Sequence, residues 1–151
     1  MKFNRSNPDD LKWLAGFFDG EGSVGLARNN TQALWRVPRV SLTQKDELDL
    51  LTDIKTHYGG SINTHVRTKN VFQWSLSGAE GAAKILEDIL PYVKLQRKRD
   101  RIVVVLAIAK LMLEKSWHST FANASEATVE DHSYRSALED KFDELKEGEV
   151  N

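Results

Sequence analysis

Apolar residues recur at helical spacing in several parts of the chain. Leu14, Ala15 and Phe18 form a stripe that predicts an opening helix over residues 11–23. Asn7 can cap its start, and Pro8 suits its first turn, where an N–H would have no partner. Later stripes predict two more helices, one with Leu48, Leu51 and Ile54 that ends at Gly59-Gly60, and one with Ala82, Ala83, Ile85, Leu86 and Ile89 that ends before Pro91.

Between these helices, apolar and polar residues alternate one by one, which is the spacing of half-buried strands. The alternation predicts strands over residues 23–26, 35–43, 61–67 and 71–77, joined in pairs by turns at 28–32 and 68–70. Pro38 cannot donate a ladder hydrogen bond, so its part of the second strand is expected at an edge or a bulge. The predicted order is α, β, β, α, β, β, α, in an α+β fold.

Polar residues mark where the second and third helices are expected to begin. Thr43, followed by Asp46 and Glu47, is expected to start the second helix. Ser77 and Glu80 have the spacing of a capping box for the third helix.

The last third of the chain predicts two more helices. Residues 102–113 carry a β-branched run that could form a strand, but its length and flanking charges favour a helix packed on the body. Residues 115–132 are polar and are expected to form a loop. Tyr134, Leu138, Phe142 and Leu145 then form a stripe at helical spacing, which predicts a docked C-terminal helix followed by a few disordered residues.

Bulk properties limit the class of protein. The 151 residues are expected to form a single domain with its own core, and the absence of cysteine excludes disulfides, thiolate metal sites and cysteine nucleophiles. No apolar run approaches the ~18 residues that a membrane span needs, and residues 1–8 lack a signal-peptide pattern. We therefore expect an intracellular protein with no membrane partner.

Charge is distributed unevenly along the chain. The net charge is -1, but residues 1–120 contain 18 Lys and Arg against 13 Asp and Glu, whereas residues from about 121 onward form an acidic tail with 3 against 9. A basic body is what the neutralisation of nucleic-acid phosphates requires. Ordinary surface charge explains the same numbers nearly as well, so charge alone decides little.

The opening helix carries the most specific pattern, LAGFFDGEGS at residues 14–23. Gly16 and Gly20 leave a bare strip on one face, where a second helix could pack closely. Asp19 and Glu21 fall at the helix C-terminus, where a carboxylate is disfavoured by roughly 0.3–1 kcal/mol unless a cation lies nearby. The alternative is a buried helix that ends in a glycine cap.

Residues 14–23 resemble the motif of the LAGLIDADG homing endonucleases at ten consecutive positions. The resemblance implies an αββαββα core with an antiparallel, saddle-shaped DNA-binding sheet and added C-terminal helices. It also implies that motif helices of two subunits or two half-domains pack together, here through Leu14, Gly16, Phe17 and Gly20. The last acidic residue of the motif binds divalent metal beside the scissile phosphates, which places the metal at Glu21 with Gly20 beside it. The family more often has Asp there.

The resemblance also implies polar residues around the metal. Gln44 matches a Gln near the active site, and Leu48 replaces a basic residue often found one turn later. The family's active-site Lys would align with Gln96, so Arg97 or Lys98 must take its role. Mg²⁺ is the expected cofactor because the ligands are hard oxygens, with Mn²⁺ able to substitute and Ca²⁺ supporting binding without cleavage.

The predicted hairpins supply candidate DNA contacts, because amides, hydroxyls and arginines read base edges in a major groove that admits a β-ribbon. A solvated sheet face would alternate in the same way. The candidates are Arg28, Asn30, Gln32, Arg36, Arg39, Ser41, Asn63, His65, Arg67, Lys69, Gln73 and Ser75.

The motif occurs once in the chain, and one Glu21 is insufficient to cut two strands. A homodimer on a long, nearly palindromic duplex site is therefore expected. The resemblance implies double-strand cleavage that leaves 3′ overhangs and promotes intron or intein mobility, in an organelle or in a prokaryotic or phage-host cytoplasm. The alternatives are an RNA-binding intron maturase and a DNA-binding protein with a vestigial site.

Overall fold

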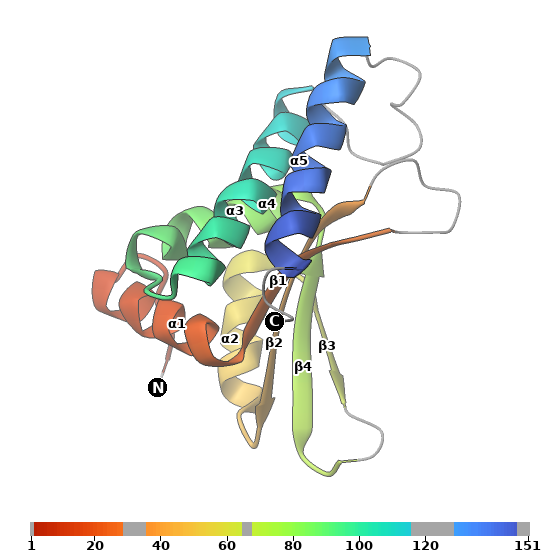
Figure 1. Ribbon diagram of the computed structural model, residues 1–151. Coiled ribbons are helices and arrows are strands. Elements are labelled where there is room, and N and C mark those ends of the chain that lie inside the picture. Colours follow the sequence, from red (N-terminus) through yellow and green to blue (C-terminus); the bar gives the residue numbers. More distant parts are fainter. Residues whose placement is uncertain (1, 29–35, 65–67, 116–128, 148–151) are drawn as a thin grey trace.

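The computed structural model describes residues 2–28, 36–64, 68–115 and 129–147 (Figure 1). The predicted order α, β, β, α, β, β, α is confirmed, and the α+β class with it. The elements are α1 (Pro8–Glu21), β1 (Gly22–Ala27), β2 (Val37–Lys45), α2 (Leu48–Tyr58), β3 (Ser61–Thr64), β4 (Val71–Ser77), α3 (Ala79–Ile89), a short 3₁₀ turn η1 (Leu90–Tyr92), α4 (Gln96–Glu114) and α5 (Val129–Glu147). No helix in the described ranges is long and apolar enough to cross a membrane.

The strands form one antiparallel sheet in the order β1-β2-β4-β3. Helices α1 to α4 lie against one face (Figure 1). Within the described residues, the other face is open except near β1, where the end of α5 approaches it with Phe142 and Lys146. Val40 and Leu42 of β2 are buried beneath the helices, as are Trp74 and Leu76 of β4. Their polar neighbours point to the opposite face, as the alternation predicted.

Trp74 anchors the centre of the core. Its ring is fully buried, and its Nε1 donates a hydrogen bond of 2.8 Å to the carbonyl oxygen of Gly59. Gly60 has a φ of +93°, and a Cβ there would lie 2.5 Å from the carbonyl oxygen of Ser75. The turn between α2 and β3 therefore needs glycine at residue 60, both for its backbone conformation and for its space.

The starts of α2 and α3 differ from the prediction. Strand β2 continues through Lys45, so Thr43 pairs with Gln73 in the sheet instead of capping a helix. The cap of α3 is Gly78, at a φ of +113°, and it makes no side-chain hydrogen bond. Ser77 is still paired in the sheet, so it does not form the predicted capping box.

One predicted core position of α2 is also wrong. Leu48 is 42% exposed because α2 begins at this residue, and Leu50 is buried in its place. Leu51 and Ile54 are fully buried, as predicted.

Pro38 lies in an interior strand, but its part of that strand is paired on one side only within the described residues, which agrees with the expected edge position. It pairs with Leu26 of β1, but the ladder between β2 and β4 begins one residue later, where Arg39 pairs with Ser77. The carbonyl oxygen of Pro38 accepts a hydrogen bond from the Gly78 N–H at 3.0 Å. The missing N–H of Pro38 is tolerated because β4 has already ended at this level.

Helix α4 contains the predicted segment 102–113 but begins at Gln96, so Arg97, Lys98, Arg99 and Arg101 lie in its first turns. Helix α5 packs beside α4, with Phe142 buried against the body (Figure 1). The predicted stripe is wrong at Tyr134, which is 53% exposed, whereas Arg135 and Glu139 are buried. The expected disorder of the last few residues concerns positions 148–151, which lie outside the described residues.

Candidate active site

One face of α1 is exposed and carries two glycines. Gly16 and Gly20 lie on it, and a Cβ added at either would meet nothing within 4 Å in the part of the chain that the structure describes. Trp13, which is 37% exposed, stacks on Phe17 with 5.5 Å between ring centroids. An exposed aromatic pair beside a strip without side chains is a surface that a second helix could cover.

Leu14 does not belong to this exposed face. Its side chain is fully buried, together with Ala15 and Phe18, in the core of the same chain. The predicted interface position of Leu14 is therefore wrong, because the helical period turns it about one-third of a circle or more away from Gly16 and Gly20. Gly16, Phe17 and Gly20 remain on the outer side.

Glu21 is the last residue of α1, and its side chain is exposed. Strand β1 follows at once, because the Gly22 N–H donates to the carbonyl oxygen of Phe18 and the backbone is already extended. A Cβ at Gly22 would lie 2.3 Å from Cδ1 of Phe18, so only glycine fits this junction. The carboxylate is thus held at a rigid corner between helix and sheet.

Lys98 reaches this corner from α4. Its Nζ donates hydrogen bonds to the carbonyl oxygens of Phe18, at 3.0 Å, and of Gly22. These carbonyls belong to the negative end of α1, whose last turn has no basic residue of its own. Lys98 therefore supplies the cation that two carboxylates at a helix C-terminus require.

The protonation of Lys98 is tuned by its surroundings. Burial lowers the pKa of the Lys98 ammonium, and the nearby Arg101 and Arg97 lower it further. The carboxylates of Asp19 and Glu21 act in the opposite direction. Lys98 and Glu21 are therefore close enough to interact electrostatically, although they are far apart in the sequence.

Asp19 makes the second contact between these elements. Its Oδ2 accepts a hydrogen bond from the Lys94 N–H at 2.9 Å, and its Oδ1 accepts one from the Leu95 N–H at 3.3 Å. Sequence reasoning assigned Asp19 no role. The available signal was a carboxylate at the wrong end of a helix, which calls for donors from elsewhere in the fold.

The other candidate residues lie around this corner or near it. Gln96 donates from Nε2 to Oδ1 of Asp100 at 2.8 Å, within its own helix, and Arg97 is exposed. Arg99 turns inward, where its Nη1 donates to the carbonyl oxygens of Leu90 and Val93. Of the two residues proposed for the basic role, Lys98 is the one that contacts the end of α1.

Gln44 lies near the end of β2 and is partly buried. It lines a cavity of about 400 Å³ together with Trp13 and Phe17 of α1. Gln44 is therefore next to the exposed aromatic pair, on the side of the molecule where a partner helix would pack. The place of Leu48, which the family often fills with a basic residue, is an exposed apolar side chain here.

A single chain offers an incomplete metal site. Within the described ranges, no group of three or more His, Cys, Asp or Glu residues could hold a metal ion. Glu21 fits a hard cation because its carboxylate is exposed and its ligand atoms are oxygens. Further ligands would have to come from outside this set, such as phosphate oxygens, water or a second copy of the motif.

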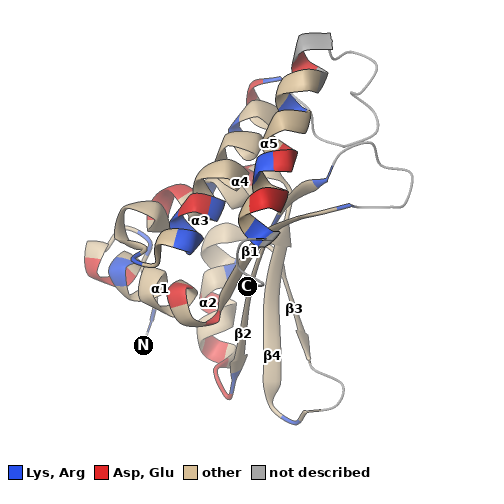
Figure 2. Ribbon diagram, viewed as in Figure 1, with Lys and Arg blue, Asp and Glu red and all other residues tan. Residues whose placement is uncertain are grey.

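The open face of the sheet is polar and free of carboxylates. Ser23, Ser41, Ser75 and Ser61 pair in one row across all the strands, and Thr43, Gln73 and Asn63 pair in the next. The strands in Figure 2 carry basic but no acidic residues. Donors and acceptors spaced in this way suit base edges and phosphates.

A hollow of about 290 Å³ lies on this face. Ser23, Arg39, Ser41 and Gln73 line it, together with Lys146 from the last turn of α5. Sequence reasoning did not select Lys146, because it belongs to a helix predicted only to dock on the body. Of the remaining candidates, Arg28 and Lys69 are exposed at strand ends, whereas Asn30, Gln32, His65 and Arg67 lie outside the described residues.

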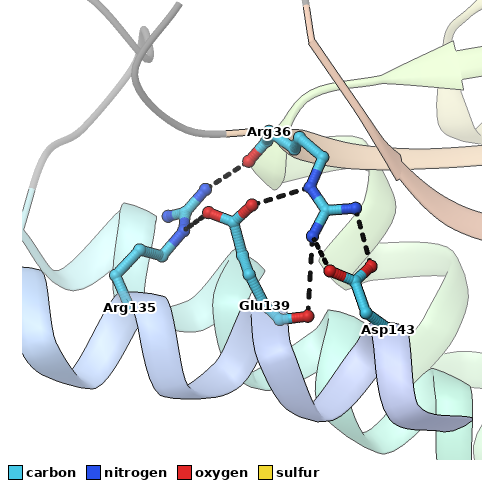
Figure 3. Close-up of polar contacts among 4 residues, drawn as sticks. All are labelled: Arg36, Arg135, Glu139 and Asp143. Carbon is cyan, nitrogen blue, oxygen red and sulfur yellow. Dashed lines mark hydrogen bonds and ion pairs between the residues drawn. The ribbon is translucent and has the colours of Figure 1, made fainter.

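Arg36 does not face the open sheet surface. Its Nε donates to Oε1 of Glu139 at 2.8 Å, and its two terminal nitrogens donate to Asp143 at 2.9 and 3.0 Å (Figure 3). Arg135, which lies on α5 with Glu139 and Asp143, donates a hydrogen bond to the carbonyl oxygen of Arg36. Hydrogen bonds from Asp143 and Glu139 raise the pKa of Arg36. The prediction that Arg36 contacts DNA is therefore wrong for this conformation, because α5 passes beside the start of β2.

An Arg36→Met variant should lose stability more than affinity for nucleic acid. The change leaves Glu139, which is largely buried, without its closest cation, whereas Asp143 is half exposed and loses less. We expect the free energy of unfolding to fall by about 1–3 kcal/mol. Urea denaturation measures this, with Arg39→Met as a control at an exposed position of β2. Equal stability of the two variants would contradict the structural role of Arg36.

A comparison with known families decides what this arrangement is. The family model for LAGLIDADG endonucleases matches residues 14–103, which include the second half of α1, the whole sheet and the start of α4. The chain belongs to the LAGLIDADG endonuclease family. The matched region begins at Leu14, so it includes the segment 14–23 that contains Glu21.

Individual relatives agree with this membership. The LAGLIDADG chain is 25% identical over 122 residues to the intron-encoded DNA endonuclease ai2b of Dictyostelium discoideum. The aligned region covers 75% of this chain and 44% of the relative. This chain therefore spans less than half of that curated relative.

Solved structures share the fold. The homing endonuclease I-CvuI, crystallised with a target in the presence of Mg and with the DNA not cleaved, superposes with a TM-score of 0.67 at 23% identity, over 94% of this chain and 85% of that one. The LAGLIDADG homing endonuclease I-SmaMI, bound to cleaved DNA, superposes with a TM-score of 0.61 at 20% identity, over 89% of this chain and 43% of that one. The archaeal intron-encoded homing endonuclease I-Vdi141I, complexed with DNA, superposes with a TM-score of 0.66 at 15% identity, over 91% of this chain and 84% of that one.

Proposed function

We propose that this LAGLIDADG chain is a sequence-specific, divalent-metal-dependent endonuclease that cuts both strands of duplex DNA. One observation carries the proposal. The exposed carboxylate of Glu21 lies where α1 passes directly into β1, the first strand of the carboxylate-free polar face. A surface suited to reading bases therefore continues without a break into a group suited to holding metal at a phosphate.

Mg²⁺ is the proposed ion, with Mn²⁺ as a substitute and Ca²⁺ as an ion that supports binding alone. When bound, a divalent ion activates water and stabilises the leaving 3′ oxygen. Glu21 would hold this ion, with the Gly20 backbone beside it. Lys98 would keep a positive charge next to the same phosphate while it satisfies the carbonyl oxygens at the end of α1. Gln44 and Arg97 would contact water or phosphate at the rim of the site.

A homodimer is the proposed active form. The motif occurs once in these residues, and the face of α1 with Gly16, Phe17 and Gly20 is open to a second α1. The chain spans 85% of the I-CvuI chain but 43% of the I-SmaMI chain, so its size corresponds to about half of the latter. Two copies related by a two-fold axis would bring both Glu21 carboxylates to adjacent scissile phosphates and would favour a nearly palindromic target.

The biological role follows from the proposed cleavage. Cuts across the minor groove would leave 3′ overhangs, and repair of such breaks would promote the mobility of an intron or intein. The intron-encoded relative from Dictyostelium discoideum supports an origin in a mobile element. An organelle is the proposed location if the gene is organelle-encoded, and otherwise a prokaryotic or phage-host cytoplasm.

A Lys146→Ala variant should weaken DNA binding without changing sequence preference. Lys146 lines the hollow that also contains Arg39, so its ammonium is placed to contact a phosphate. Loss of one phosphate contact per protomer should reduce the slope of log K against log salt by about 0.9 for each protomer. Fluorescence anisotropy in Ca²⁺ at several salt concentrations measures this. Lys141→Ala is the matched control, because it removes an exposed cation from the same helix but does not line the hollow. An unchanged slope would show that Lys146 does not contact a DNA phosphate.

The proposed function is tested directly by selection on a random duplex-DNA library. The purified protein is incubated with the library in Mg²⁺, and Ca²⁺ provides a binding-only control. Cut ends that share a nearly palindromic site are the expected result. Binding without cutting in Mg²⁺ would instead favour a vestigial DNA-binding protein. Neither binding nor cutting, together with tight binding to a structured intron RNA, would favour a maturase.

A further inference from the structure

The C-terminus of α1 and the N-terminus of α4 each supply a charged side chain that the other helix end lacks. Helix α1 has no basic residue in its last turn, and Lys98 of α4 supplies a cation to its terminal carbonyl oxygens. Helix α4 has no acidic residue in its first turn, and its cap residue Leu95 makes no side-chain hydrogen bond. Asp19 of α1 supplies the missing carboxylate to the backbone just before α4.

These two contacts form a reciprocal lock between distant parts of the chain. Asp19 binds the N–H groups of Lys94 and Leu95, and Lys98 lies on the first turn of α4 that follows them. The position of the Lys98 ammonium therefore depends on where Asp19 holds the start of α4. Arg99, which donates to the carbonyl oxygens of Leu90 and Val93, fixes the other side of the same turn.

The placement of Asp19 is unfavourable within its own helix. A carboxylate near a helix C-terminus faces the negative end of the helix dipole. Hydrogen bonds from backbone N–H groups to an ionised carboxylate are stronger than those to a neutral acceptor, and the positive end of α4 lies beside Asp19. The energetic gain from Asp19 therefore arises in the contact with α4, and it is not a contribution to α1 itself.

We propose that Asp19 is a positioning residue, which holds the first turn of α4 so that Lys98 stays beside Glu21. This inference rests on the proposed nuclease function, because it assigns Asp19 a role in the same site. Asp19 acts through Lys98 and does not contact substrate or metal itself. It would contribute to the rate of cleavage and leave the reading of bases by the sheet unchanged.

An Asp19→Asn variant tests the proposal. The amide keeps one acceptor oxygen, but its NH₂ group would face the N–H of either Lys94 or Leu95, so one contact is lost. We expect the single-turnover cleavage rate to fall by roughly 10- to 100-fold, as for other residues that orient a group at a metal site. The dissociation constant for DNA in Ca²⁺ should stay within about 3-fold of the wild type.

The matched control is Asp10→Asn. Asp10 lies at the other end of α1, where its Oδ2 accepts a hydrogen bond from the Asn4 N–H at 2.9 Å. The control therefore makes the same chemical change to a carboxylate that also accepts a backbone hydrogen bond in the same helix. Its cleavage rate should match the wild type. Equal losses in both variants would overturn the specific role of Asp19.

A double-mutant cycle with Lys98→Met separates positioning from general stability. If Asp19 acts through Lys98, Asp19→Asn should slow cleavage by no more than about 2-fold once Lys98 is already replaced. An undiminished loss in that background would overturn the proposal, because Asp19 would then act by another route.

The same cycle on thermal unfolding does not depend on nuclease activity. Each single variant should lower the unfolding midpoint by roughly 2–4 °C, and the double variant by clearly less than the sum. If the wild type cuts no DNA while this coupling is present, the proposed function fails and the lock stands. Additive midpoint shifts would overturn the lock whether or not the protein cuts DNA.

Discussion

A Glu21→Gln variant should bind its DNA target in Ca²⁺ as tightly as the wild type and cut it about 10²- to 10³-fold more slowly in Mg²⁺. The side chain is exposed at the end of α1 and is not needed for the core. Glutamine keeps the size of the side chain but removes the charge that a divalent ion requires. Single-turnover cleavage of the selected target measures the rate, and anisotropy in Ca²⁺ measures affinity.

Glu80→Gln provides the control for this experiment. Glu80 is also exposed, but it lies in the first turn of α3, on a different element from the motif. Its cleavage rate should equal that of the wild type. If Glu21→Gln cut as fast as Glu80→Gln, Glu21 could not be the metal-binding residue, and the proposed site would be wrong.

A Gly20→Leu variant should fold as a monomer and lose both dimerisation and cleavage. A Cβ at Gly20 would meet nothing within 4 Å in the described part of the same chain, and Gly20 is exposed, so we expect the fold to tolerate the change. In a dimer, two leucines would enter the space between the packed helices. Overpacking costs typically 1–3 kcal/mol for each site, so the dimer should be weakened by about 2–6 kcal/mol. Analytical ultracentrifugation over a range of concentrations measures the dissociation constant.

Ser136→Leu is the matched control for dimerisation, since it introduces the same side chain at an exposed position of α5. Circular dichroism should show a native helix content for both variants, because leucine has a higher helix propensity than either glycine or serine. Gly16→Leu should behave like Gly20→Leu. A Gly20→Leu protein that remained a dimer would exclude this face of α1 as the interface.

The local patterns in the sequence were sufficient for the order of elements and for most of the core. The stripe of Leu14, Ala15 and Phe18 and the alternation around Val40 and Leu42 depend on spacing alone, and the structure buries all of these residues. Spacing is a local property of the chain. It survives whatever the rest of the fold does, which is why these predictions were confirmed.

The failures at Arg36 and Thr43 have a different cause, because each depends on a neighbour that is distant in the sequence. Arg36 was expected to face DNA, but Glu139 and Asp143 of α5 hold its guanidinium. Thr43 was expected to cap a helix, but it pairs with Gln73 of β4 instead. Single-sequence patterns contain no information about which distant element will lie beside a residue.

The candidate site was partly predictable for the same reasons. The motif alone identified Glu21, and the helix-end argument called for a nearby cation, which is Lys98 in the structure. The choice between Arg97 and Lys98 needed the orientation of α4, because adjacent residues on a helix point about 100° apart. The contacts of Asp19 needed the loop before α4 to be placed in space.

The junction between α1 and β1 has a mechanical consequence. Glu21 ends the helix and Gly22 begins the strand, so no flexible residue separates the carboxylate from the strand next to the reading surface. The Phe18 ring packs so closely against Gly22 that the backbone has no free space to shift at this junction. A strand displaced by an ill-fitting sequence would carry the carboxylate out of line with its phosphate. In the proposed nuclease, the fit of the target sequence would therefore affect both steps, binding to the sheet and cleavage at Glu21.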